Sequence, residues 1–349
     1  MKKEVIAIQY LRGIAAMMVV VHHMLSPTTR IDYLSNSNLG PFGVKLFFVI
    51  SGFIMWYTTA NSNISPVAFW RRRIARIVPL YWIFLAILIG AALRFPNLFH
   101  TTVITPENAT KSFLFIPHFH VVQTGLIAPI LIPGWSLNYE MFFYFVFGFL
   151  LLIGSRIVRI TVLGLGFLAL VLLGFAVQPA DAVLSTYTNP DLLKFLYGAS
   201  LAILYQAGAL RSPVLGVALL ATGVLSFLLV PASSELARIN DLLGISATTI
   251  VAGALALEDA VRRAPSLILR TIGDASYSIY LSHLFILRVT ELLGEHLSLF
   301  GSGRMWDAIY LAGALTSAVV GGICIHYLLE RPLASLGTGR RRILLNEPA

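Results

Sequence analysis

Arg12 and His23 lie in the first apolar segment of the chain, and their types and spacing indicate chemistry inside a membrane. They are 11 positions apart, and a helix turning about 100° per residue brings such positions to one face, about 16 Å apart along its axis. Histidine suits a general base near neutral pH because its ordinary pKa is about 6.5. An arginine in hydrocarbon costs at least ~2.5–3.5 kcal/mol, so Arg12 should face a polar cavity or an anion. His23 is therefore a candidate general base with Arg12 on the same helix face; the alternatives are an interfacial histidine and a snorkelling arginine.

A second candidate site is the arginine run at residues 71–76, RRRIAR. Within it, Arg73 and Arg76 are one helical turn apart. Guanidinium groups bind phosphate oxygens in a bidentate way, so this pair is predicted to hold the phosphates of an acyl donor such as coenzyme A. The alternative is a basic anchor at the cytoplasmic end of a membrane span.

Glu140 lies about one turn inside the apolar segment that GWSLNYEMFFY begins. An intramembrane carboxylate indicates a functional site by default. We expect Glu140 on the same side of the membrane as His23, where a carboxylate could fix the histidine tautomer. The alternative is a structural ion pair with Lys45 or Arg94.

Residues 273–285, GDASYSIYLSHLF, give a later apolar segment a polar face that ends at Ser282 and His283. A substrate-facing role is one interpretation. The other is packing, because small hydroxyl residues in membrane helices often serve only interhelical hydrogen bonding.

The composition assigns these residues to a membrane protein. The chain has 349 residues, of which 57% are hydrophobic and 12% charged, whereas a soluble domain carries about 25% charged residues. The net charge of +9 is explained by basic cytoplasmic loops, so no nucleic-acid partner is expected. The single cysteine excludes an internal disulfide.

The apolar segments predict an all-α, polytopic protein with about ten transmembrane helices and both termini in the cytoplasm. We expect a transmembrane domain over residues 1–335 and a short basic tail over 336–349. The expected outer stretches and outer helix ends hold seven basic residues, which are Arg30, Arg94, Lys111, Lys194, Arg238, Arg288 and Arg304. The expected cytoplasmic stretches hold 16 of the 25 basic residues: Lys2, Lys3, Arg71, Arg72, Arg73, Arg76, Arg156, Arg159, Arg211, Arg262, Arg263, Arg270, Arg331, Arg340, Arg341 and Arg342. The ten expected spans are 6–25, 42–60, 77–94, 136–154, 160–177, 191–209, 213–230, 241–258, 272–292 and 306–328.

The outer connection over residues 95–135 is too long and too rich in proline for one helix. Its apolar half suggests that it enters the membrane or covers a cavity. His118 and His120 could ligate a metal from one side of an extended segment, but no cysteine or acidic cluster accompanies them, so no metal is expected.

Five ordered motifs resemble the acyltransferase-3 family of integral membrane acyltransferases, over nearly the whole chain. The family's basic residue, ten residues and histidine are matched by LRGIAAMMVVVHH, and its second-span motif by GVKLFFVISGFIMWY. Its arginine pair is matched by RRRIARIVPLYW, and its fourth and penultimate spans by GWSLNYEMFFY and SYSIYLSH. The sequences of these motifs are most similar to those of the branch that acylates exopolysaccharides.

The resemblance implies transfer of an acyl group, usually acetyl, from cytoplasmic acyl-coenzyme A to a carbohydrate hydroxyl, by a multi-pass protein of the inner membrane. It implies catalysis by His23 with Arg12 and donor binding by Arg73 and Arg76. Ser51, Ser282 and His283 are expected to bind substrate. The partners would be acyl-coenzyme A, a saccharide acceptor and membrane lipid.

One departure from the family pattern is Lys45, at a position that is often acidic in relatives, so any acidic role there is lost and a different choice of acceptor or partner is expected. Two other functions fit the composition. A transporter or flippase of a lipid-linked saccharide or anion also has many spans with buried charges, but the sequence shows no repeated half. A scaffold without chemistry leaves the buried charges unexplained.

Overall fold

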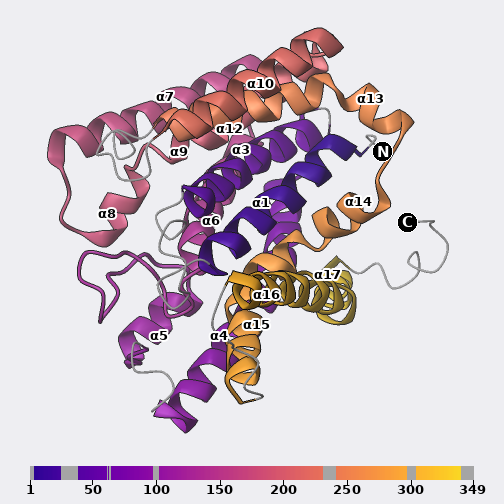
Figure 1. Cartoon of the computed structure of the whole chain (residues 1–349). Coiled ribbons are helices and arrows are strands. Elements are labelled where there is room, and N and C mark those ends of the chain that lie inside the picture. Colours follow the sequence, from indigo (N-terminus) through magenta and orange to yellow (C-terminus); the bar gives the residue numbers. More distant parts are fainter. Residues whose placement is uncertain are drawn as a thin grey trace. The chain divides into compact units, whose positions relative to one another are not determined.

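The computed structural model describes residues 4–24, 38–60, 62, 64–96, 102–230, 241–296 and 304–338. Most of these residues are helical (Figure 1), and extended backbone pairs among them only at an isolated antiparallel bridge between Phe119 and Ile127. The expected all-α class is confirmed, and a helix lies in each of the ten expected ranges. The helices are α1 (Ile6–Met24), α3 (Leu39–Thr59), α4 (Pro66–Arg94), α5 (Pro106–Phe113), α6 (Gly134–Leu150), α7 (Arg156–Val177), α8 (Ala182–Tyr187), α9 (Leu192–Gln206), α10 (Pro213–Leu229), α12 (Asp241–Ala256), α13 (Glu258–Arg263), α14 (Leu267–Asp274), α15 (Ser276–His296), α16 (Arg304–Ile325) and α17 (Arg331–Thr338), with a π-helical turn at His326–Glu330.

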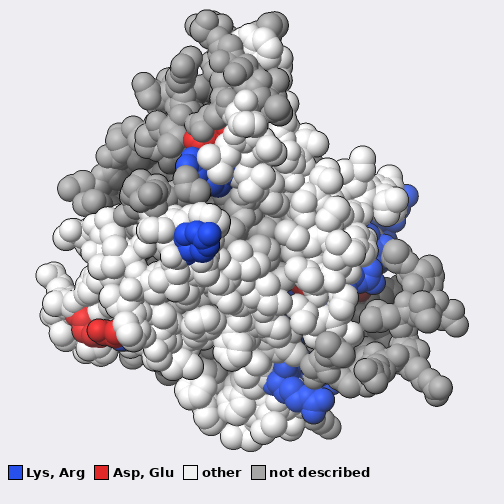
Figure 2. Space-filling view, turned by 90° about the horizontal axis from the view of Figure 1, so that it is seen from below, with Lys and Arg blue, Asp and Glu red and all other residues white. Residues whose placement is uncertain are grey.

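Length and composition make this a multi-pass membrane protein. Among the described residues, five helical stretches are long and apolar enough to cross a bilayer: Ile6–Met24, Leu39–Thr59, Pro66–Arg94, Arg156–Val177 and Ala308–Ser335. Large apolar side chains such as Ile157, Leu165 and Phe175 of α7 are exposed, as expected where lipid replaces water. In the view of Figure 2, the described surface is almost entirely uncharged, and charged side chains form only small patches.

One compact unit comprises Met1–Asn61 and Leu193–His326. In this unit α1 is the central helix, because it contacts α3, α12, α13, α14, α15 and α16. Its contact with α14, α15 and α16 is built from buried small and apolar residues, among them Ala16, Val20, Ala275, Ala314 and Ala318. Small side chains let membrane helices approach closely.

Glycines explain the close crossing of α3 and α9 in the same unit. A Cβ on Gly52 would lie 2.0 Å from the carbonyl oxygen of Phe195, and a Cβ on Gly198 would lie 1.9 Å from that of Val49. Only glycine leaves room for these two backbones at this spacing. The glycine of the second-span motif is therefore required for packing.

The other unit comprises Ser62–Leu192 and Tyr327–Ala349, with α4 packed against α5, α6 and α17. The span expected at residues 77–94 was too short, because α4 begins at Pro66, where the Ser65 side chain accepts from the N–H of Ala68. The arginines of residues 71–76 therefore lie within α4 and do not precede it. A helix of 29 residues is about 43 Å long, so its ends extend beyond a hydrocarbon core of about 30 Å.

The helix boundaries correct one further expectation and confirm another. The expected span at 272–292 is wrong as a single helix, because α14 ends at Asp274 and α15 begins at Ser276. This break lies where α1 and α14 touch: a Cβ on Gly273 would lie 2.0 Å from the carbonyl oxygen of Gln9. The connection over 95–135 is not one helix, as expected; its described part contains α5 and the bridge at Phe119.

Candidate active site

His23 and His283 form a side-chain pair within the first unit. His23 lies in the last turn of α1, and His283 lies in the second turn of α15 with no exposed surface. The Nε2 atom of His283 is 3.2 Å from Nδ1 of His23, and the ring centroids are 4.9 Å apart. Each Nδ1 also faces a backbone carbonyl, that of Val19 at 2.9 Å for His23 and that of Tyr280 at 2.6 Å for His283.

Arg12 lies on the same side of α1 as His23, as the spacing predicted. Its side chain is buried, and its Nη1 donates to Oε1 of Gln9 at 2.8 Å. Arg12 is within electrostatic reach of Asp274, the last residue of α14. Since α14 and α15 are consecutive, the arginine and the histidine both face the α14–α15 side of α1. Between them, Ala16 and Val20 are fully buried in the apolar cluster.

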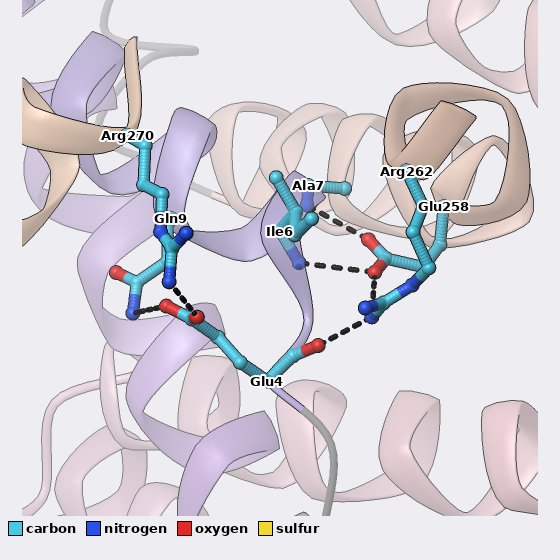
Figure 3. A network of polar contacts seen from close by, with 7 residues as sticks. All are labelled: Glu4, Ile6, Ala7, Gln9, Glu258, Arg262 and Arg270. Atoms are coloured by element: carbon cyan, nitrogen blue, oxygen red, sulfur yellow. Dashed lines mark hydrogen bonds and ion pairs between the residues drawn. The ribbon is translucent and has the colours of Figure 1, made fainter. Parts of the chain in front are cut away.

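The start of α1 is held by a polar network that positions both residues along the helix axis (Figure 3). The Glu258 carboxylate accepts from the N–H groups of Ile6 at 3.0 Å and Ala7 at 2.8 Å, and pairs with Arg262 at 2.5 Å. Nearby, Glu4 pairs with Arg270 at 2.7 Å. We call these four charged residues the α1 clamp. A helix begins with N–H groups that lack intrahelical partners, and a carboxylate from another helix satisfies two of them here.

Arg73 and Glu140 are brought together in the second unit through Tyr144. Arg73 forms a side-chain hydrogen bond with Tyr144, and the Tyr144 hydroxyl donates to the Glu140 carboxylate. We call these three residues the arginine cluster. Buried Nε of Arg73 has no hydrogen-bond partner within the described residues. Arg76 follows one turn later on α4, half-buried, so the expected shared face of the two arginines is present.

The remaining predicted residues are buried in the first unit. Ser51 of α3 and Ser282 of α15 have little or no exposed surface, and the Ser282 hydroxyl donates to the carbonyl of Ser278 at 2.7 Å. Lys45, the departure from the family pattern, is also buried. The substrate-binding role expected of these serines stays a prediction.

Sequence reasoning missed two residues of these sites, Tyr144 and Glu258, and it missed the burial of Lys194. Tyr144 was one aromatic residue among many in GWSLNYEMFFYF, although it follows Glu140 by one helical turn. Glu258 could have been noticed as an acidic residue at the end of an apolar segment. Lys194 was counted as a residue of an outer helix end, but its side chain is fully buried; its place directly before an apolar run was the available signal.

His118 and His120 line a small pocket of about 10 Å³ together with Thr102, Asn108 and Val121. His118 Nδ1 faces the carbonyl of Ile116 at 2.9 Å. In the part of the chain that the structure describes, no group of three or more His, Cys, Asp or Glu residues could hold a metal ion.

Comparison with known proteins identifies the relatives of this chain. Exopolysaccharide production protein ExoZ of Rhizobium meliloti (strain 1021) is 39% identical over 310 residues, which cover 87% of this chain and 92% of ExoZ. Acyltransferase MdmB of Streptomyces mycarofaciens is 28% identical over 383 residues, covering 97% of this chain and 93% of MdmB. Peptidoglycan O-acetyltransferase OatA of Listeria monocytogenes serovar 1/2a is 27% identical over 238 residues, covering 61% of this chain and 36% of OatA. No solved structure matches the chain significantly.

Residues 5–328 match the family described as an acyltransferase domain, of the acyltransferase-3 type. The match begins directly before α1 and ends after α16, so it includes the histidine pair, the α1 clamp and the arginine cluster. Together with the 39% identity to ExoZ, it shows that this chain belongs to the acyltransferase-3 family.

Proposed function

We propose that this protein is an inner-membrane O-acetyltransferase. It moves an acetyl group from cytoplasmic acetyl-coenzyme A to a hydroxyl of a lipid-linked or surface saccharide. The names of ExoZ and OatA support a polysaccharide acceptor, and the name of OatA supports acetyl as the transferred group. The observation that carries the catalytic part is the His23–His283 contact at 3.2 Å, because it places a hydrogen-bonded imidazole at the end of the family's arginine–histidine helix.

The proposed reaction uses His23 as general base and then as general acid. Its Nε2 takes the proton of the acceptor hydroxyl as the oxygen bonds to the thioester carbonyl carbon. The carbon–sulfur bond then breaks, and the protonated Nε2 returns the proton to the coenzyme A thiolate. The products are the sugar ester and free thiol, so atoms and charge balance without a metal. Arg12, about 16 Å from His23 along the helix axis, would act on the bound donor and not on the oxyanion that forms beside His23.

Donor binding is assigned to Arg73 and Arg76, which would pair with coenzyme A phosphates. The hydrogen bonds of the arginine cluster suggest how Arg73 is held for this task, because Tyr144 connects it to Glu140. In this proposal Glu140 helps to hold Arg73 in place for donor binding, through the hydroxyl of Tyr144. Its expected role beside His23 stays a prediction, as does the passage of the pantetheine arm past Arg12.

The first test is transfer of labelled acetyl from acetyl-coenzyme A to cell-envelope glycans by purified protein in detergent. His23→Ala should lower transfer by about 10²–10⁴-fold, the usual contribution of a general base. Thr290→Val is the control, because it removes a hydroxyl that bonds the Ile286 carbonyl at 2.9 Å on α15, and it should keep transfer within about threefold of wild type.

Undiminished transfer by His23→Ala would overturn the catalytic assignment. Detergent removes any transmembrane gradient, so labelled glycan also distinguishes a transferase from a transporter. A folded wild-type protein that labels no glycan from this donor contradicts the proposed reaction, and the transport alternative then becomes the one to measure by saccharide flux.

A further inference from the structure

We propose that His283 is the positioning residue of the catalytic histidine: its neutral Nε2 accepts a hydrogen bond from Nδ1–H of His23 and holds His23 with its Nε2 lone pair free for substrate. This inference rests on the proposed function of His23. It replaces the expected direct contact of His283 with substrate, because both ring nitrogens of His283 are already engaged in the structure.

The proton positions follow from the partners of each ring. A backbone carbonyl can only accept, so the Nδ1 atoms that face the carbonyls of Val19 and Tyr280 must both carry hydrogen. In a neutral His283, Nε2 is then the acceptor. The Nδ1–H of His23 is therefore shared between Val19 O at 2.9 Å and His283 Nε2 at 3.2 Å, a three-centre hydrogen bond. The other ring nitrogen of His23, Nε2, then carries the free lone pair.

The same geometry requires a neutral His283. A doubly protonated His283 would direct an Nε2–H at the Nδ1–H of His23, and two donors cannot satisfy each other. The surroundings favour the neutral ring, because His283 is fully buried and burial disfavours charge. Within the described residues, no carboxylate hydrogen-bonds or pairs with either ring of the pair.

Within the described residues, aromatic rings contact each member of the pair. His22 contributes an edge-on ring 5.2 Å from that of His23, and Tyr280 lies 6.1 Å from His283 on its own helix. From the other packed helices, Phe47 of α3 contacts Tyr280, and Tyr310 of α16 packs against the apolar cluster below. The pair thus resembles an Asp–His arrangement in which an imidazole replaces the carboxylate as acceptor.

The function of such an acceptor is to orient the base and to support the positive charge that it gains. When His23 Nε2 takes the acceptor proton, Nδ1–H becomes a stronger donor, and His283 Nε2 is in place to accept. Losing this acceptor should slow the chemical step without changing substrate affinity. A residue that contacts substrate directly would change KM as well.

The kinetic test compares two substitutions of His283 with a control on the same helix. His283→Leu should lower kcat about 10–100-fold, with both KM values within about threefold of wild type. In His283→Gln, Oε1 can accept from His23, so this variant should recover most of the lost kcat. The control, Thr290→Val, removes a hydroxyl that bonds the Ile286 carbonyl at 2.9 Å, and should keep the wild-type kcat. A folded His283→Leu with wild-type kcat, or a folded His283→Gln no faster than His283→Leu, overturns the proposal.

A second measurement needs no variant to fold. In wild-type protein labelled with ¹⁵N-histidine in lipid discs, nitrogen NMR at neutral pH should show Nδ1 protonated and Nε2 unprotonated in both rings of the close pair. A His23 with unprotonated Nδ1, or a doubly protonated His283, overturns the proposal. This readout is independent of activity, so a wild-type protein that transfers no acetyl contradicts the proposed function without deciding the tautomers.

Discussion

At the scale of single residues, the Tyr144 hydroxyl links Arg73, the expected donor-binding arginine, to the Glu140 carboxylate. Tyr144→Phe removes this link while keeping the ring contacts with Phe69 and Phe143. Freed from Tyr144, Arg73 would lose part of its preorganisation. We expect KM for acetyl-coenzyme A to rise about 3–10-fold, with kcat changed less than about threefold.

Steady-state kinetics with varied donor measures this effect, and Tyr81→Phe is the matched control. Tyr81 lies on the same helix as Arg73, and its hydroxyl donates to the carbonyl of Ser112 at 3.1 Å, away from the arginine cluster. An equal rise of KM in both variants would assign the effect to general loosening of this unit and contradict a specific role for Tyr144.

His120 gives the expected outer connection an acid-sensitive turn. Its Nδ1 accepts from the N–H groups of Val122 at 3.3 Å and Gln123 at 3.1 Å. Burial, with a smaller contribution from nearby His118, lowers the pKa of His120 below 6.5. The neutral ring therefore stabilises the turn fully above pH 6.5, and this stability is lost as the pH falls from 6.5 towards the folded-state pKa.

Hydrogen exchange at Val122 and Gln123, corrected for intrinsic rates, should accordingly show weaker protection at pH 5.5 than at pH 7.5. In His120→Asn, the side-chain oxygen can accept the same two hydrogen bonds but does not titrate. Protection in that variant should not depend on pH. An unchanged pH dependence in His120→Asn would show that another group controls the turn.

The residue-scale features differ in how far the sequence could predict them. The shared face of Arg12 and His23 follows from helical periodicity alone, which is a local property. The contact of His23 with His283 depends on how α1 and α15 pack, and these helices are more than 200 positions apart in the chain. No spacing rule contains that information. Glu140 was recognised by its type, but the partner named for it came from an expected topology.

At the scale of elements, the α1 clamp fixes the register of the helix that carries Arg12 and His23. The Glu258 carboxylate is 2% exposed and satisfies two N–H groups and one guanidinium. Any axial shift of α1 would break these bonds and move His23 away from His283. The clamp is therefore a structural requirement for the histidine pair at the opposite end of α1.

Glu258→Gln should lower the free energy of unfolding by about 1–2 kcal/mol, since an uncharged amide keeps at most part of the cap and loses the ion pair. Denaturation of purified protein in mixed micelles measures this. Asp259→Asn, at the exposed neighbouring position, is the control and should change stability by less than about 0.5 kcal/mol. Equal stability of Glu258→Gln and wild type would contradict the clamp.

Helix positions were predictable because each bilayer-spanning segment must be long and apolar. Both properties can be read from one continuous stretch of sequence. Helix ends were less predictable. The beginning of α4 at Pro66 depends on a cap that lies outside the apolar stretch. The break between α14 and α15 occurs at GDAS, which contains no proline, where the backbone of α1 approaches Gly273.

At the scale of the whole molecule, the two compact units are both discontinuous in the chain. The first combines Met1–Asn61 with Leu193–His326, and the second combines Ser62–Leu192 with Tyr327–Ala349. Hydropathy orders the segments along the sequence but carries no record of which segments pack together. The five family motifs are consequently divided between the units, with the arginine–histidine helix in one and the arginine pair in the other.

The charge bias that predicts the membrane orientation includes the two arginines of the α1 clamp. Arg262 and Arg270 pair with carboxylates on the expected inner side, and Lys111 and Arg288 pair on the expected outer side. Without the two arginines of the α1 clamp, the expected inner stretches still hold 14 of their 16 basic residues, against seven in the expected outer stretches. The excess of inner charge therefore does not depend on the clamp, and it favours cytoplasmic termini.

Labelling of single cysteines in intact cells tests this orientation. The native Cys324 is first replaced in Cys324→Ser, and then Val121→Cys and Asp259→Cys are made at positions that are exposed in the structure. A membrane-impermeant maleimide should label Val121→Cys from the outer side and label Asp259→Cys only after the membrane is opened. The reverse result would place the α1 clamp outside, at the end of α1 opposite His23. Cytoplasmic acetyl-coenzyme A would then meet the histidine end of that helix directly, and the donor would need no route along it.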